Sequence, residues 1–127
     1  MPTRPCSEGD REGRLLKARQ FLEAAELVEA IADDVDLLDA HITLCVHAGI
    51  AAADVVCCAR LGERATGHNH QEAVALLSRV DKVLARDLAT LLGMKTRAGY
   101  SSTPSSSAGA KAASRSATRL VTAATSI

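Results

Sequence analysis

Apolar residues recur every three or four positions in four separate segments of this chain, and this spacing constrains the fold more than any other feature. In an α-helix, such spacing places the apolar side chains on one face. The apolar residues are mostly small or aliphatic, because 47% of the chain is hydrophobic but only 2% is aromatic. At 127 residues the chain is long enough for one domain with its own core. The sequence therefore predicts a single all-α domain.

The first two helical segments are separated by the short acidic sequence DDVD. Ser7 and Asp10 have the spacing of a capping box, in which each side chain caps the backbone N–H of the other residue. We expect the first helix to begin there and to run to about Ala32. The second helix is expected from about Asp36 to Leu61. It is apolar around most of its circumference, which predicts a central helix that is buried on most sides.

The third and fourth helical segments are separated by a connector rich in Gly, Ser and Pro at 99–107. Asn69 and Glu72 give the start signal of the third helix, which keeps its apolar spacing to about Leu92. The fourth helix has a stripe of small and apolar residues, formed by Ala110, Ala113, Ala117, Leu120 and Ala124.

Short connectors favour antiparallel neighbours in a bundle. The four segments therefore predict an antiparallel four-helix up-and-down bundle at residues 10–125, preceded by a flexible N-terminal tail at 1–9. The second helix has more apolar surface than one small bundle buries, so we also expect a homodimer that forms through the second or the fourth helix.

The formal net charge is zero, but the charges are unevenly distributed. Eight acidic residues and no Lys or Arg lie between Gln20 and Ala59, whereas no acidic residue follows Asp87. The basic residues after that point are Lys95, Arg97, Lys111, Arg115 and Arg119. Two interpretations remain open: the basic end contacts phosphate groups, or acidic and basic helices pair within the bundle or across a dimer.

The four cysteines form no paired CxxC motif, and the adjacent Cys57 and Cys58 point about 100° apart on a helix. We therefore expect no metal and no other cofactor, and we interpret the cysteines as small buried residues. The polar N-terminus lacks a signal-peptide core, and no run of eighteen apolar residues is long enough to span a bilayer. These features predict a cytoplasmic protein without membrane attachment, in which disulfides are uncommon.

The histidines give weaker signals than the charges. His68 and His70 lie where the third helix is expected to begin, and we interpret them as capping or packing residues. His47 and Asp54 lie two helical turns apart on the narrow polar line of the second helix. They are either a buried acid–base pair or a structural hydrogen bond.

Several segments of the chain, taken in order, resemble the HEPN superfamily (higher eukaryotes and prokaryotes nucleotide-binding) over roughly residues 14–124. These are LLKARQFLEAAELV, then HITLCVHAGIAAADVVCCARLG, then GHNHQEAVALL, and finally LLGMKTRAGYSS before an Ala-rich last helix. Within the resemblance, MKTRAGY corresponds to an extended segment before the last helix.

The resemblance implies a dimeric four-helix bundle of bacterial toxin-antitoxin and defence modules, often encoded with a nucleotidyltransferase partner. Many members are metal-independent ribonucleases that use an Arg and a His a few residues apart near the start of the last helix. Arg97 matches the Arg, but Ser102, Thr103 and Pro104 occupy the place of the His. The ribonuclease motif is therefore incomplete.

The sequence thus predicts a non-catalytic HEPN-like bundle that binds a nucleotide, RNA or a protein partner. Two alternatives are a purely structural dimerisation module and a metal-independent ribonuclease toxin that uses His68 or His70. Arg97 is expected to hold a phosphate, and Tyr100 to stack on a base. The full set of expected binding residues is Lys95, Arg97, Tyr100, Lys111, Arg115 and Arg119.

Overall fold

The computed structural model describes residues 3–32, 36–66 and 69–127, which form five helices and one two-stranded sheet. The elements in chain order are β1 (Thr3–Pro5), α1 (Glu8–Ile31), α2 (Leu38–Leu61), β2 (Glu63–Ala65), α3 (His70–Ser78), α4 (Lys82–Gly99) and α5 (Ser107–Thr125). The predicted all-α class is confirmed. The number of helices is not the four that the sequence predicted, and the small sheet was not predicted.

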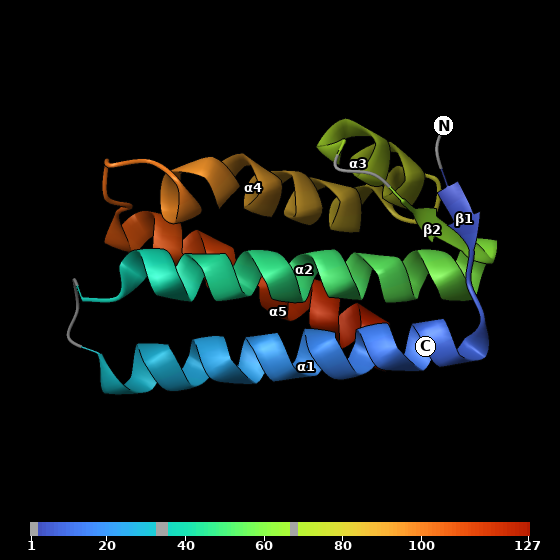
Figure 1. The fold of residues 1–127 in the computed structure, drawn as a ribbon, viewed down its shortest axis with the longest axis horizontal. Coiled ribbons are helices and arrows are strands. Elements are labelled where there is room, and N and C mark those ends of the chain that lie inside the picture. Colours follow the sequence, from blue (N-terminus) through green and yellow to red (C-terminus); the bar gives the residue numbers. More distant parts are fainter. Residues whose placement is uncertain (1–2, 33–35, 67–68) are drawn as a thin grey trace.

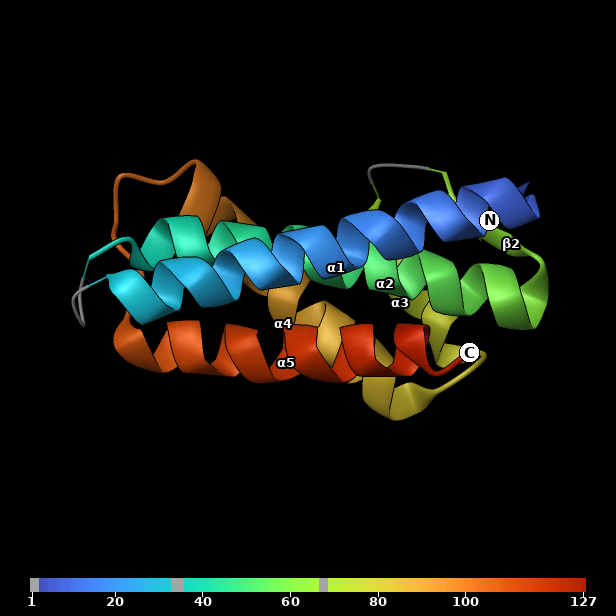
Figure 2. The ribbon, with the colours of Figure 1, turned by 90° about the horizontal axis from the view of Figure 1, so that it is seen from below.

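The helix α2 is the centre of the molecule, and α1, α4 and α5 pack around it (Figures 1 and 2). The polypeptide runs in opposite directions in α1 and α2, and again in α4 and α5. The prediction of a central second helix is confirmed, because α2 carries most of the buried residues of the domain.

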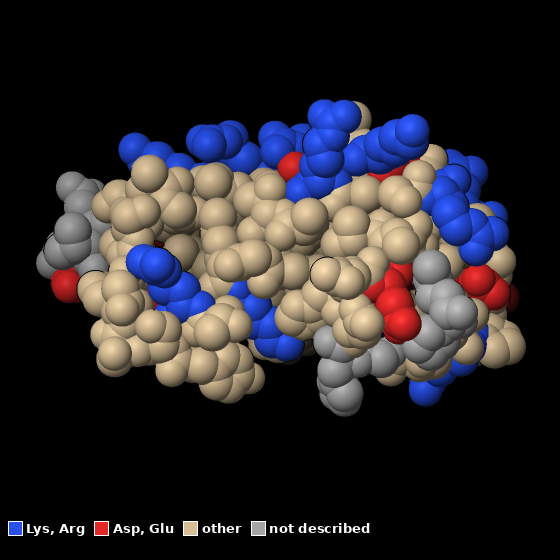
Figure 3. Space-filling view, turned by 90° about the horizontal axis from the view of Figure 1, so that it is seen from above, with Lys and Arg blue, Asp and Glu red and all other residues tan. Residues whose placement is uncertain are grey.

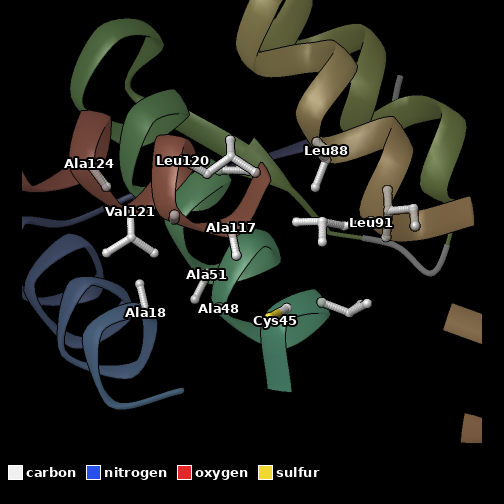
Figure 4. Packing of buried hydrophobic residues seen from close by; sticks show 14 of the residues in the cluster. Ala18, Cys45, Ala48, Ala51, Leu88, Leu91, Ala117, Leu120, Val121 and Ala124 are labelled. Carbon is white, nitrogen blue, oxygen red and sulfur yellow. The ribbon is translucent and has the colours of Figure 1, made fainter. Parts of the chain in front are cut away.

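Small residues on α2 let its neighbours approach closely. Figure 4 shows Ala48 and Ala51 of α2 beside Ala18 of α1 and Ala117 of α5. Gly49 of the same helix lies against Leu91 of α4 and Leu120 of α5. A Cβ atom at that position would collide with the Leu91 side chain and would lie 3.3 Å from Cδ1 of Leu120.

The same helix has a membrane-like composition, with a mean hydropathy of 1.9 over an 18-residue window. Among the described residues it is the one helix that is long and apolar enough to cross a membrane, although polar residues such as His47 and Asp54 interrupt its apolar sequence. However, 67% of that window is buried inside the protein. Its apolar surface is thus covered by α1, α4 and α5, as is usual for the core helix of a globular domain.

Two helix starts agree with the sequence prediction. The Ser7 hydroxyl accepts a hydrogen bond from the Asp10 N–H, and the Asp10 carboxylate accepts one from the Ser7 N–H, both at 3.0 Å. At α3, the Asn69 side-chain oxygen accepts hydrogen bonds from the N–H groups of Gln71 and Glu72. These caps satisfy N–H groups that a helix leaves without partners at its start.

The prediction of one continuous third helix is wrong, because this segment forms two helices, α3 and α4. Asp81 is the N-cap residue of α4, so a new helix begins after it. Its carboxylate accepts hydrogen bonds from the N–H groups of Val83 at 2.8 Å and Leu84 at 3.0 Å. The chain reverses there, so α3 packs back against α4. His70 at the start of α3 consequently lines the same pocket as Lys95, near the end of α4.

The resemblance implied that the segment MKTRAGY is extended. This expectation is wrong, because α4 continues to Gly99. Lys95 and Arg97 therefore lie on the last turns of a helix, and the connector is shortened to residues 100–106. The fourth predicted helix, α5, is confirmed. Its predicted stripe from Ala110 to Ala124 is its buried face.

Residues 1–9 were expected to be a flexible tail, but the described part of this segment is tethered. β1 pairs antiparallel with β2, and the Cys6 N–H donates a hydrogen bond to the Gly62 carbonyl at 3.1 Å. Gly62 ends α2 with a φ of 73°, a conformation that glycine adopts readily, and this turn directs β2 back along β1.

The interpretation of all cysteines as unpaired is also wrong, because Cys6 forms a disulfide with Cys58 across a Cα–Cα distance of 5.5 Å. The pairing of β1 with β2 positions Cys6 beside the last turn of α2. Cys45 and Cys57 are free and buried, as predicted. Their burial raises the pKa of Cys45 to about 11 and that of Cys57 to about 12, so both thiols are protonated near neutral pH.

Candidate functional site

The predicted binding residues do not form one cluster. Lys95 lines a hollow of about 170 Å³ together with Tyr100 and His47. Arg97 lines a different hollow, beside Ser105 and Ser106 of the connector. Two residues along a helix correspond to a rotation of about 200°, so Lys95 and Arg97 face nearly opposite directions on α4.

The other predicted residues of α5 gather with residues of α4 along one edge of the molecule. Figure 3 shows Lys and Arg side chains lined up along that edge. Lys111, Arg115 and Arg119 are exposed and repeat every four residues, so they share one face of α5. We call this surface the basic edge: α5 contributes Lys111, Arg115 and Arg119, and α4 contributes Lys82 and Arg86, the exposed cations that precede Asp87, the partner of Arg119.

Arg119 joins the two helices of the basic edge. Its guanidinium group contacts the Asp87 carboxylate of α4 twice, with Nε 2.9 Å from Oδ2 and Nη2 2.6 Å from Oδ1. The Ser116 hydroxyl donates a further hydrogen bond to the same carboxylate at 3.0 Å. The hydrogen bonds to Asp87 raise the pKa of Arg119. Asp87 is almost fully buried, so the Arg119 ion pair has a structural role, although half of the Arg119 side chain remains exposed.

The sequence left open whether the basic residues after Asp87 pair with acidic helices. Among these residues, Arg119 is the one that forms an ion pair within the described parts of the chain. Its partner lies on α4, outside the acidic stretch of α1 and α2. Lys111 and Arg115 form no ion pair with any residue in the described parts of the chain. Their positive charges are therefore available to a ligand.

His47 and Asp54 do not form the acid–base pair that the sequence left open. Asp54 instead contacts Arg14 at 2.9 Å and Arg64 at 3.7 Å. Burial raises the pKa of Asp54, and the two nearby guanidinium groups counteract part of that increase. His47 is exposed and packs against the Phe21 ring, with 5.4 Å between the ring centroids.

A buried polar cluster around His41 was missed by the sequence analysis. His41 Nδ1 lies 2.9 Å from the Ala25 carbonyl oxygen, and because a carbonyl only accepts hydrogen bonds, Nδ1 carries a proton. His41 Nε2 lies 2.7 Å from the Ser114 hydroxyl and 3.3 Å from the Glu29 carboxylate. These contacts join α1, α2 and α5, and the available sequence signal was a lone histidine on the apolar face of the second helix.

A pocket with several polar side chains in its wall lies between α2, β2, α3 and α4. This pocket has a volume of about 290 Å³ and contains His47, Asp54, His70 and Lys95 in its wall. His70 lies near the end of α4, because α3 folds back on α4. His68, the other histidine considered for catalysis, lies outside the described residues.

Comparison of the chain with protein-family models, with curated proteins and with solved structures gives no match. The resemblance to the HEPN superfamily therefore remains a prediction.

Proposed function

We propose that this chain is a non-catalytic, HEPN-like binding module that holds RNA by its phosphate groups along the basic edge. In this proposal it works as a homodimer in a toxin-antitoxin or defence module, beside a nucleotidyltransferase partner, as the resemblance implies. The observation that carries the proposal is the row of exposed cations that α4 and α5 contribute to one edge (Figure 3).

The spacing of these cations supports contact with several phosphates at once. Lys111, Arg115 and Arg119 are each separated by four residues, which corresponds to a rise of about 6 Å along α5. Lys82 and Arg86 repeat the same spacing on α4. A polyanion that neutralises such a row releases its condensed counterions, and this release favours binding at low salt.

The alternative of a structural dimerisation module is favoured by one observation. Large apolar side chains are exposed on α1, namely Leu16, Leu27 and Ile31, with exposed fractions of 67%, 59% and 81%. The apolar surface that we expected on the second helix is buried within the subunit. A dimer would therefore use α1 instead of α2.

The proposal is tested by binding of a labelled single-stranded RNA, measured by fluorescence anisotropy. The double variant Lys111→Gln/Arg115→Gln should bind at least about tenfold more weakly, because each lost charged contact is worth on the order of 1 kcal/mol or more. The matched control is Lys17→Gln/Arg19→Gln, which removes the same charges from exposed positions of α1. Equal affinities of the two double variants would contradict binding at the basic edge.

A further inference from the structure

The pocket between α2, β2, α3 and α4 is separate from the basic edge and has an apolar interior. Ile50 of α2, Leu76 of α3, and Leu88 and Leu92 of α4 line it. Its volume of about 290 Å³ is equal to that of about ten water molecules in the liquid. This is enough room for the apolar body of a small organic molecule.

One end of this pocket is positively charged. Lys95 and His47 line both this pocket and the adjoining hollow that contains Tyr100. The two side chains therefore lie where the two spaces meet. Lys95 is half-buried and forms no ion pair with the residues that the structure describes. A half-buried ammonium group that lacks a carboxylate partner beside an apolar space is suited to an anionic ligand group.

The acidic group in the pocket wall is already neutralised. Asp54 contacts Arg14 at 2.9 Å and Arg64 at 3.7 Å. It also lies seven residues beyond His47 on α2, a rise of about 10 Å, which places it toward the other end of the pocket. Its charge therefore opposes an anion at Lys95 only weakly.

We propose that this pocket binds a small amphipathic carboxylate. The apolar body of the ligand lies among Ile50, Leu76 and Leu88, and its carboxylate accepts hydrogen bonds from Lys95, with His47 beside it. The apolar lining favours burial of a hydrocarbon body, and the ammonium group selects a carboxylate over a neutral or cationic head group.

The probe for the first test is octanoate, which has about ten non-hydrogen atoms and so matches the volume of the pocket. Isothermal titration calorimetry with the full-length protein compares the affinity for octanoate with the affinities for octanamide and octylammonium. We expect octanoate to bind about tenfold more tightly than octanamide, and octylammonium to bind most weakly, because a charge-assisted hydrogen bond is stronger than a neutral one. Equal affinities for the three probes, or no binding of octanoate at millimolar concentration, would overturn the proposal.

Two pairs of variants locate the binding site. Lys95→Gln should reduce octanoate affinity to that of octanamide, whereas Arg97→Gln, on the other side of α4, should leave it unchanged. Ala73→Leu places a larger side chain in the pocket wall and should abolish binding, whereas Ala75→Leu on the exposed side of α3 should not. Circular dichroism melting verifies that each variant is folded. If Lys95→Gln and Arg97→Gln bind octanoate equally, the proposed position of the carboxylate is wrong.

Discussion

Reduction of the Cys6–Cys58 disulfide should strongly destabilise this protein. The two cysteines are separated by 52 residues, so the bond removes considerable loop entropy from the unfolded chain. In the chain-entropy model a loop of this length corresponds to about 4 kcal/mol of stability. For a domain of this size, that free energy corresponds to a decrease in melting temperature of about 10 to 20 °C.

The assay is thermal unfolding with and without a thiol reductant. Unfolding is followed by circular dichroism at about 222 nm, where helices give a strong signal. The variant Cys6→Ala should melt at the temperature of the reduced parent and should not respond to reductant. A parent protein that melts at the same temperature in both conditions would refute the reasoning. A thiol titration of the unreduced, denatured protein gives an independent check, because the structure requires two free thiols, Cys45 and Cys57.

The disulfide also bears on the predicted cytoplasmic location. Disulfides persist in oxidising compartments and are rare in the cytosol. Acid quenching of its native cells, followed by alkylation of the denatured protein, would distinguish the two cases. A cytoplasmic chain should show four reactive thiols after denaturation, whereas a chain in an oxidising compartment should show two.

Four further outcomes are expected. Gly49→Ala should lower the free energy of unfolding in a urea titration by about 1 to 3 kcal/mol, because the added methyl group overpacks the contact with Leu91. Asp87→Ala should cost about 1.5 to 3 kcal/mol in the same titration, because it removes charged hydrogen bonds and leaves buried Ser116 without its partner. The raised pKa values of Cys45 and Cys57 imply stability that is fully present below pH 9 and is lost as the pH rises toward 11 or 12. The free energy of unfolding should therefore be lower at pH 10 than at pH 8 by about 1 kcal/mol per thiol, and Cys57→Ala should reduce this difference. Labelled RNA should stay intact on incubation with the protein, because the described residues that line the hollow beside Arg97 include no general base, and cleavage that is lost in His70→Ala and Arg97→Ala would contradict a non-catalytic function.

Helix positions could be predicted from the sequence where caps and apolar spacing agree. Ser7 and Asn69 cap the helices that they were expected to cap, and the stripe from Ala110 to Ala124 is buried. The break before α4 was missed because the apolar spacing continues through it. Asp81, a strong N-cap residue in the middle of that pattern, was the available signal.

The long-range contacts could not be predicted, because they depend on how the helices are placed in space. The pairing of β1 with β2 involves two segments of three residues each, too short to show an alternating pattern. The Cys6–Cys58 bond follows from that pairing. The separation of Lys95 from Arg97 was foreseeable only once both residues were known to be helical.

The most direct test of the proposed function is the salt dependence of RNA affinity. The four cations of the basic edge that lack an ion pair within the described chain are Lys82, Arg86, Lys111 and Arg115. Contact of all four with a single strand predicts a slope of about −3 for the logarithm of affinity against the logarithm of salt concentration. The variant Lys111→Gln/Arg115→Gln should halve that slope to about −1.5. A slope near zero for the parent, or an unchanged slope in the variant, would contradict binding of RNA phosphates at the basic edge.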